Sequence, residues 1–353
     1  MPVTDTFGPY ISARVHGMKK NLLKRSAIEA MLDKADLRSL SDGLLSSPYG
    51  DEMAESLARY EGADAIEDAV SRNLVNTFSK LYRMCSGQYD AQARIFVGRW
   101  DLEAVKALLR NRHNGLDATT GAGSLFPGPS MPVALLDEMA SQDSMETLVR
   151  ALAAWNGKLC GSMVAKLPEY TEGRGLRVLE EALDHAYFVD NLRRLGGGRD
   201  ENSRFLKRLL RMEIDRINLR ILFEPRGSDV APEDVIRRMI PRGLLPEKSL
   251  RAIATAQAPD RAVSLLEGTI YADLAEGIAA MAQTGQYSRV ERLFEVAFVD
   301  RLRHAALHHA VGFSILMWYA WLKFNEVKNL RLVVRGLSAG MSADRIREEV
   351  MYG

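Results

Sequence analysis

The chain has 353 residues, 47% of them hydrophobic, so it is long enough to bury a sizeable core. Its 47 lysine and arginine residues nearly cancel its 46 aspartate and glutamate residues, so the overall charge calls for neither nucleic acid nor an anionic membrane surface as a partner. Cys85 and Cys160 lie outside any CxxC or Cys/His spacing, so we expect neither a disulfide framework nor a structural zinc site.

The N-terminal residues 1–8 contain an acid and a proline but no basic start followed by an apolar run. They do not resemble a signal peptide, and we expect a cytoplasmic protein. The run RVHGMKKNLLKR that follows at 14–25 is expected to form a basic helix or helix edge. A solvated face is the simpler interpretation, and contact with an acidic partner is the alternative. Its basic residues are Arg14, Lys19, Lys20, Lys24 and Arg25.

One pattern of ten residues recurs three times along the chain. It reads DLEAVKALLR from Asp101, DRINLRILFE from Asp215 and EVKNLRLVVR from Glu326. A shorter element precedes each copy at a nearly constant distance, and its copies begin at Leu74, Phe188 and Phe298. Chance would rarely keep two patterns in register across three copies, so we infer an internal repeat.

The recurring polar positions are an acid, an amide three residues later in two copies, and a base five residues after the acid. They are Asp101 and Lys106 in the first copy, Asp215, Asn218 and Arg220 in the second, and Glu326, Asn329 and Arg331 in the third, with Ala104 replacing the amide in the first. The apolar positions four, seven and eight residues after the acid share one side of a helix and are expected to be buried. They are Val105, Leu108, Leu109, Leu219, Leu222, Phe223, Leu330, Val333 and Val334.

The acid lies at the same helical angle as this apolar stripe. An unpaired buried carboxylate would cost several kcal/mol, so the acid is expected either to be paired or to cap the start of its helix. The base points away from the acid, and a pairing across helices or across repeats is expected for it. Because one active site does not need the same group at three separated places, the recurrence favours a structural role over catalysis.

Segments rich in glycine and proline follow the first two copies, at 115–132 and 224–234, and they indicate turns. Between them apolar residues recur at spacings of three and four, without sustained alternation of the β-strand type. We therefore predict an all-α fold of three helical repeats with boundaries 1–117, 118–228 and 229–353.

Three other segments invite a functional interpretation. The apolar run 311–322 is shorter than the roughly 17 to 25 residues that a bilayer requires, so a buried helix is expected. Asp300, His304 and His308 are spaced by four and could ligate a metal, although a polar contact between helices is simpler. The glycines at 196–198 with Arg199 could form an anion nest or, more simply, a turn that ends a helix. We assign no catalytic, metal-binding or cofactor-binding residue.

Five segments together resemble one protein family through their order and spacing. They are YISARVHGMKKNLLKR from Tyr10, WDLEAVKALLRNRHNG from Trp100, HAYFVDNL from His185, RMEIDRINLRILF from Arg211 and ADRIREEV from Ala343. This series resembles the C subunit of the archaeal and bacterial A/V-type rotary ATPases, which is the counterpart of the d subunit in vacuolar ATPases. The resemblance covers nearly the whole chain.

The resemblance implies three similar helical bundles around a pseudo-threefold axis, forming a funnel with a central cavity. It implies a non-catalytic rotor component, peripheral on the cytoplasmic face of the membrane, that caps the ring of proteolipid subunits and seats the central-stalk subunits. ATP hydrolysis or synthesis would thereby be coupled to ion transport, with no cofactor and no nucleic acid involved. The alternatives are a helical scaffold with other partners and a metal-dependent enzyme that uses the helix face of His304.

Overall fold

The computed structural model describes residues 7–34, 36–85, 89–116, 125–198, 200–223, 231–256, 259–284, 287–308 and 312–350. Over these residues the regular structure is helical, and pairing of the β type is limited to an isolated bridge between Gly128 and Met131. The all-α fold class predicted from the helical periodicity is therefore confirmed.

The chain divides into two compact units. Unit 1 comprises Met1–Leu152 and Ala305–Gly353, and unit 2 comprises Ala153–His304. These units are groups of residues in contact, and they do not follow the three sequence segments 1–117, 118–228 and 229–353. The division into three repeats stays a prediction about the recurring helical pattern.

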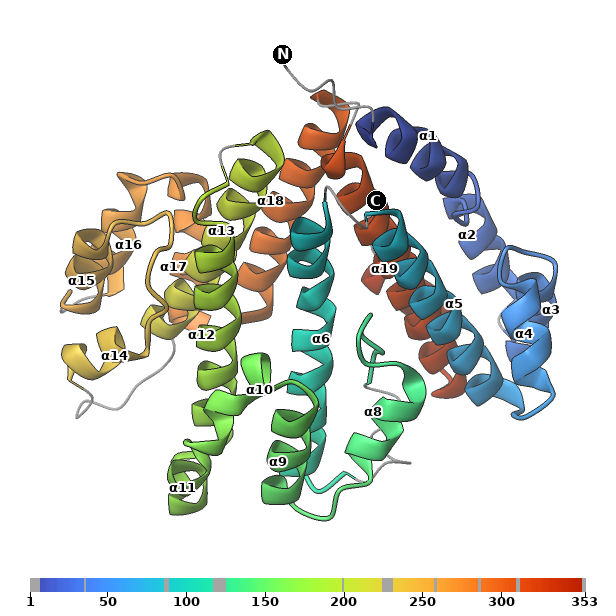
Figure 1. Cartoon of the computed structure of the whole chain (residues 1–353), viewed down its shortest axis with the longest axis horizontal. Coiled ribbons are helices and arrows are strands. Elements are labelled where there is room, and N and C mark those ends of the chain that lie inside the picture. Colours follow the sequence, from blue (N-terminus) through green and yellow to red (C-terminus); the bar gives the residue numbers. More distant parts are fainter. Residues whose placement is uncertain are drawn as a thin grey trace. The chain divides into compact units, whose positions relative to one another are not determined.

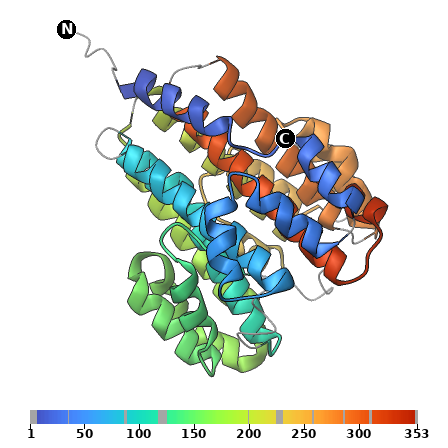
Figure 2. The ribbon, with the colours of Figure 1, turned by 90° about the vertical axis from the view of Figure 1, so that its right-hand side faces the viewer.

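Unit 1 contains both ends of the described chain. Its helices are α1 (Phe7–Lys19), α2 (Arg25–Lys34), α3 (Leu37–Leu45), α4 (Gly50–Leu57), α5 (Gly62–Met84), α6 (Asp90–His113), α8 (Val133–Ala140), α19 (Phe313–Ser338) and α20 (Ala343–Glu349). Helix α19 packs along α5 and also contacts α1 (Figures 1 and 2). Segments from the start and the end of the sequence therefore share one core.

Aromatic rings fill part of that core. Trp100 on α6 contacts Phe78 on α5, with ring centroids 4.5 Å apart, and Phe96 in an edge-on arrangement at 5.2 Å. Such pairs add to the stabilisation that burial of the rings already gives. On α19, Phe313 and Leu316 are completely buried, so the part of the apolar run that the structure describes as helix, from Phe313 onward, is a core helix as expected. Among the described helices, none has both the length and the apolar character needed to cross a bilayer.

Unit 2 is built from a second series of helices. They are α10 (Gly157–Val164), α11 (Leu167–Glu169), α12 (Arg177–Arg194), α13 (Glu201–Phe223), α14 (Pro232–Arg238), α15 (Glu247–Ala254), α16 (Pro259–Glu267) and α17 (Ala275–Thr284). Helix α12 packs against α10 and α13, and α13 contacts α14 and α17. Two further helices, α9 (Met145–Trp155) and α18 (Tyr287–His308), begin in one unit and end in the other.

The three copies of the sequence pattern occupy equivalent places in the helix order. The shorter element lies on α5, α12 and α18, and the acidic pattern lies on the long helix that follows, α6, α13 or α19. Each copy is therefore a pair of consecutive long helices, and the acid stands on the second of them.

Candidate functional site

The three recurring acids are buried in the middle of their helices. Asp101 is 5% exposed, Asp215 is 0% and Glu326 is 5%. Their helices begin many residues earlier, at Asp90, Glu201 and Phe313. The alternative that each acid caps the start of its own helix is therefore wrong, because the free backbone N–H groups of a helix lie only in its first turn.

Asp215 holds the loop that leads into α15. Its carboxylate accepts hydrogen bonds from the backbone N–H groups of Leu244 (2.8 Å) and Leu245 (3.1 and 3.2 Å to its two oxygens). The hydroxyl of Tyr271 donates a further bond of 2.8 Å to the same carboxylate. These hydrogen bonds offset the free-energy cost of removing the carboxylate from water.

Two more residues of α13 hold the same loop. Asn218, one turn after the acid, makes a two-way amide contact with Ile240, in which its Nδ2 donates to the carbonyl and its Oδ1 accepts from the N–H, both at 2.8 Å. Arg211, one turn before the acid, donates from Nε and Nη2 to the carbonyl of Gly243 at 3.1 and 2.7 Å. One face of α13 thus fixes the loop at both ends and in the middle.

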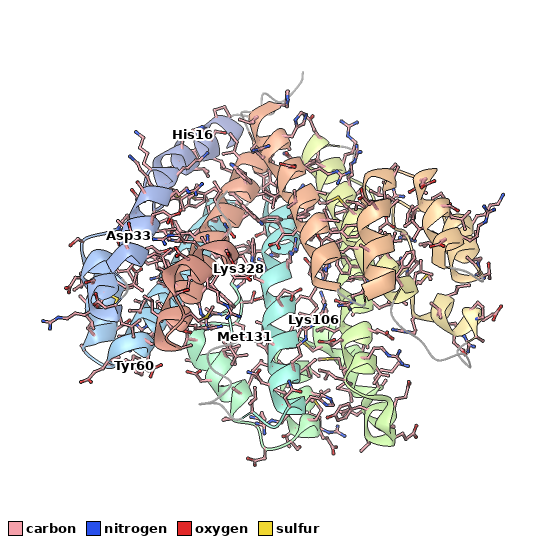
Figure 3. The ribbon with its side chains drawn as sticks, turned by 180° about the vertical axis from the view of Figure 1, so that it is seen from behind. His16, Asp33, Tyr60, Lys106, Met131 and Lys328 are labelled. Carbon is pink, nitrogen blue, oxygen red and sulfur yellow. The ribbon has the colours of Figure 1, made fainter. Side chains whose placement is uncertain are left out.

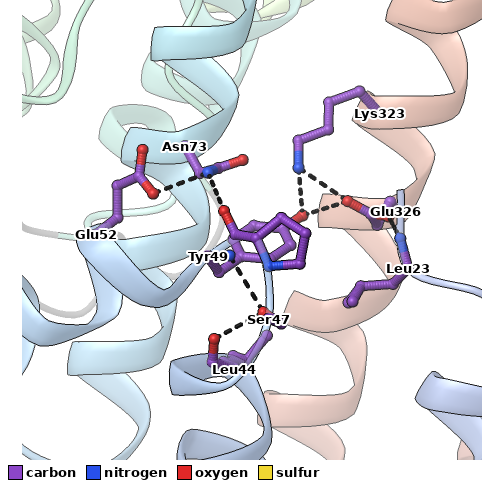
Figure 4. A network of polar contacts seen from close by, with 9 residues as sticks. Leu23, Leu44, Ser47, Tyr49, Glu52, Asn73, Lys323 and Glu326 are labelled. Atoms are coloured by element: carbon purple, nitrogen blue, oxygen red, sulfur yellow. Dashed lines mark hydrogen bonds and ion pairs between the residues drawn. The ribbon is translucent and has the colours of Figure 1, made fainter. Parts of the chain in front are cut away.

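Glu326 makes the corresponding contact at the other end of the sequence (Figure 4). Its carboxylate accepts from the backbone N–H of Leu23, in the loop before α2, and from the hydroxyl of Tyr49 at 2.6 Å. Lys323, one turn earlier on α19, donates from Nζ to Glu326 at 2.9 Å and to the Tyr49 oxygen at 2.8 Å. The last copy of the pattern therefore holds the first loop of the chain.

The cluster of Lys323, Glu326 and Tyr49 contains two charged groups and is almost completely buried from solvent. Lys323 is 3% exposed, and its Nζ also lies 4.0 Å from the centre of the Tyr49 ring. Burial lowers the pKa of Lys323 below its usual value, although Glu326 opposes that shift. Burial and the neighbouring Glu326 raise the pKa of Tyr49 well above its ordinary value, so its hydroxyl stays protonated and serves as a donor.

Asp101 holds the loop that leads into α8. Its Oδ1 accepts from the backbone N–H of Ser130 at 3.0 Å. Gly128 lies so close that a Cβ added there would meet the same oxygen at 2.1 Å. In the second copy a Cβ at Gly243 would meet Oδ1 of Asp215 at 2.0 Å. Glycine is required at both positions because the loop backbone approaches the carboxylate directly.

We call each of these contacts a carboxylate latch: Asp101 with the loop 128–132, Asp215 with the loop 240–246, and Glu326 with the loop 21–24. Each loop ends where a short helix begins, at α8, α15 or α2. Tyr49 follows Leu23 at the same spacing as Tyr271 follows Leu245, whereas the corresponding position of the first copy falls on Gly157. The tyrosine donor therefore belongs to two of the three latches.

The recurring bases have different surroundings. Arg331 is 2% exposed, and its Nη2 donates to Glu67 on α5 at 2.8 Å, which is the pairing across helices that the sequence predicts. It also donates to the carbonyl of Leu125, and its guanidinium lies 4.0 Å from the centre of the Phe126 ring. Burial lowers the pKa of Arg331 to about 10. In the other copies Lys106 is buried and Arg220 is partly exposed. The recurring amide of the third copy, Asn329, is 3% exposed.

The apolar stripe of each motif helix faces the interior. Val105, Leu109, Leu330, Val333 and Val334 are completely buried, and the others are at most 5% exposed apart from Phe223, which is partly exposed. The expected burial of these positions is therefore confirmed, with Phe223 the least buried of them.

The described residues do not support the two other candidate sites. Asp300, His304 and His308 are exposed on α18, and Asp300 pairs with Arg303 at 3.1 Å. Within the described ranges, no group of three His, Cys, Asp or Glu side chains could hold a metal ion. The glycines at 196–198 form a turn after the end of α12, and Lys207 donates to two of their carbonyls, at 3.3 and 2.9 Å. Arg199 lies outside the described residues.

The latch of Asp215 is expected to make stability depend on pH. Burial raises the pKa of Asp215 to about 6 in the folded protein, against about 3.9 in an unfolded chain. Between these values the folded state binds more protons than the unfolded state, so the free energy of unfolding falls as the pH rises, by up to about 1.4 kcal/mol per pH unit for this group. Above the pKa of Asp215 in the folded protein, its contribution to the free energy of unfolding no longer changes with pH.

The variant Asp215→Asn isolates the pH-dependent contribution of Asp215 to stability, because the asparagine side chain does not titrate. Denaturant unfolding of both proteins from pH 4 to 8 should show the wild-type advantage shrinking between about pH 4 and 6 and levelling off above. A difference that is constant with pH, or that grows as the pH rises, would contradict the raised pKa.

A second prediction concerns the close approach of Gly243. The variant Gly243→Ala should lower the free energy of unfolding by about 1 to 3 kcal/mol, because the new Cβ displaces the loop from Asp215. Gly161→Ala, inside α10 with no atom within 4 Å of the added Cβ, is the matched control and should stabilise by about 0.5 to 1 kcal/mol. Equal effects of the two substitutions in urea unfolding would contradict the latch geometry.

The chain has clear relatives among known proteins. Residues 11–349 match the family described as ATP synthase (C/AC39) subunit. A protein of Haloquadratum walsbyi is 27% identical over 357 residues, covering 99% of this chain and 100% of its own length. One of Methanosarcina barkeri is 26% identical over 348 residues, covering 97% and 92%. One of Methanococcoides burtonii is 24% identical over 345 residues, covering 97% and 93%. Each of the three is named as the C subunit of an A-type ATP synthase.

Proposed function

The chain belongs to the ATP synthase (C/AC39) subunit family, and from this premise we propose that it works in the central rotor of an A/V-type ATPase. In this role it caps the ring of proteolipid subunits on the cytoplasmic side of the membrane and seats the tip of the central stalk. It carries out no covalent chemistry of its own. It passes torque between the soluble head and the ring, so that ATP turnover and ion transport are coupled.

The observation that carries this proposal is the extent of the match. The family match begins at residue 11 and ends at 349, and the three relatives align over more than nine tenths of their own length. A shared domain inside an otherwise different protein would leave long unmatched stretches on one side or the other. A sequence match from end to end favours the same place in the complex.

The carboxylate latches support the architecture that we propose, three similar bundles around a pseudo-threefold axis with a central cavity. Each acid-bearing helix holds the loop that opens the next group of short helices, and within unit 1 Glu326 of the last copy holds Leu23 of the first. A cyclic arrangement of equal parts requires such a contact between its last and first members.

The chemistry of the recurring side chains also fits a mechanical part. Asp215 and Glu326 accept hydrogen bonds from backbone N–H groups and tyrosine hydroxyls, and Arg331 is paired with Glu67. These groups stiffen the connections between helices, which suits a rotor that must transmit torque. Because no described helix can cross a bilayer, attachment to the membrane would run through the ring.

Copurification tests the proposal directly. The chain carries an affinity tag in its own host, membranes are solubilised in mild detergent, and the bound proteins are identified. We expect the proteolipid, the stalk subunits and the catalytic head to elute with the chain in fixed proportions. Elution alone or with unrelated proteins would contradict the proposal and favour a scaffold with other partners.

Loss of the chain provides the functional readout. Membranes that lack it should keep ATP hydrolysis by the head but lose most ATP-driven ion pumping, because the shaft no longer engages the ring. Pumping that persists at the wild-type rate per ATP hydrolysed would contradict the coupling role.

A further inference from the structure

A small apolar groove lies on unit 1 between α1, the end of α18 and the first turns of α19. It encloses about 180 Å³, and its wall includes Val15, Ile315 and Trp318, with His16 and Lys19 at its edge. Leu307 forms part of the wall and is nevertheless 72% exposed, an unusual state for a large aliphatic side chain. We call this feature the α1–α19 groove.

The groove is held in shape by its own framework. Helix α1 is fixed to the start of α19 by a hydrogen bond of 3.2 Å from the N–H of Gly312 to Oγ of Ser12, and Ile11 and Val15 of α1 are buried against the core. In the wall, the indole of Trp318 is stacked on that of Trp321, with ring centroids 5.4 Å apart. Binding there would require little ordering of side chains.

The two chain segments that form the groove carry charges of one sign only. The sequence from residue 6 to 28 contains no aspartate or glutamate, and neither does the sequence from 305 to 325. Among the described residues, the acids that flank these segments already have partners: Glu29 pairs with Arg25 and Arg347, Asp300 pairs with Arg303, and Glu326 lies in its latch. The basic residues of the N-terminal run are all exposed: Arg14, Lys19, Lys20, Lys24 and Arg25.

We infer that the α1–α19 groove is a docking surface for an acidic segment of another protein in the same assembly. An apolar side chain of that segment enters the groove beside Leu307, and its carboxylates lie against Lys19 and Lys20. Apolar anchors in a preformed pocket give binding energy, and complementary rim charges give orientation and rate of association. The inference rests on the proposed function, because the partner is sought among the subunits of the rotary complex.

A membrane surface fits the groove less well than a polypeptide does. A helix that lies in a lipid interface presents its apolar face to the acyl chains, whereas Ile11 and Val15 of α1 are already buried in the protein. What remains exposed is a basic face beside a small concave pocket, and an anchored peptide has the matching shape.

Photo-crosslinking inside the purified complex tests the inference. Benzoylphenylalanine replaces Leu307, the complex is irradiated, and mass spectrometry identifies the attached segment. We expect a segment that contains an apolar residue flanked by several aspartates or glutamates. The matched control carries the same probe at Tyr60, which is 46% exposed and lies far from His16 on the same unit (Figure 3), and it should not label that segment.

Charge reversal shows whether the basic rim matters. The double variant K19E/K20E should lower the crosslinking yield at Leu307 by at least about fivefold, whereas K80E, at an exposed lysine of α5, should leave the yield unchanged. The K19E/K20E variant could also fail to join the complex while the isolated chain keeps its melting temperature. This result would support the inference in the same way as a lower crosslinking yield.

Four results would overturn the inference: adducts with lipid, attachment to a neutral or basic segment, no adduct in the intact complex, or a yield that charge reversal does not change. Binding of the isolated chain to phosphatidylglycerol vesicles that K19E/K20E abolishes would also overturn it, in favour of a membrane contact. If the chain does not copurify with the complex, the proposed function itself fails, and this outcome is distinct from all of these.

Discussion

Replacing Glu326 with alanine is expected to lower the free energy of unfolding by about 3 to 5 kcal/mol, because the change leaves the ammonium of Lys323 buried without its carboxylate. Lys323 and Glu326 are 3% and 5% exposed, so water does not take over the lost contact. The N–H of Leu23 and the hydroxyl of Tyr49 lose their acceptor at the same time. Urea unfolding of the isolated chain, followed by circular dichroism, gives the difference.

A double variant separates the buried charge from simple loss of packing. Lys323→Met combined with Glu326→Leu removes both charges, and we expect it to recover most of the stability that Glu326→Ala loses. Tyr49→Phe, which removes only the hydroxyl, should cost about 1 kcal/mol. If the double variant is less stable than Glu326→Ala, the explanation by an unpaired charge is wrong.

The second large effect concerns the apolar stripe of the motif helices. Leu330→Ala and Leu219→Ala should each cost about 2 to 5 kcal/mol, because both side chains are buried, at 0% and 1% exposure, and their removal leaves a cavity. Leu307→Ala is the matched control, and at 72% exposure it should change the stability by less than about 0.5 kcal/mol.

The same unfolding measurement compares the three variants. Losses below about 0.5 kcal/mol for Leu330 and Leu219 would mean that these helices bury another face. Such a result would also remove the physical reason for the recurrence of aliphatic residues at these positions.

Much of this architecture can be predicted from the sequence. Apolar spacings of three and four predict the helices, and the fixed distance between two recurring elements places each acid on the second of two consecutive long helices. Because a buried carboxylate requires donors, the recurrence of Asp101, Asp215 and Glu326 also predicts that each is either paired or a cap of its own helix, and the structure shows pairing.

The identity of those partners is not predictable from the recurrence alone. The donors are backbone N–H groups of loops, which any non-proline residue offers, and the partner of Glu326 lies at the opposite end of the chain, at Leu23. One signal was present in the sequence. A Leu-Leu pair ends two positions before the first residue of α2 and of α15, and a tyrosine, Tyr49 or Tyr271, follows each pair at the same spacing.

The partners in individual ion pairs are likewise not predictable from the sequence alone. The pattern predicts a partner across helices for Arg331, but Glu67 is one of many acids in the chain, and its choice depends on the packing of α5 against α19. The requirement for glycine at 128 and 243 likewise arises only when the loop backbone meets the carboxylate. Such contacts follow from the tertiary fold, and local spacing does not encode them.

The position of the chain in the assembled motor tests the central claim most directly. In a cryo-electron microscopy map of the intact ATPase, we expect one copy of this chain between the proteolipid ring and the central stalk, with the stalk tip seated in a hollow that the three pairs of long helices surround. Density for the chain on the stationary side of the complex, or away from the ring, would contradict the claim.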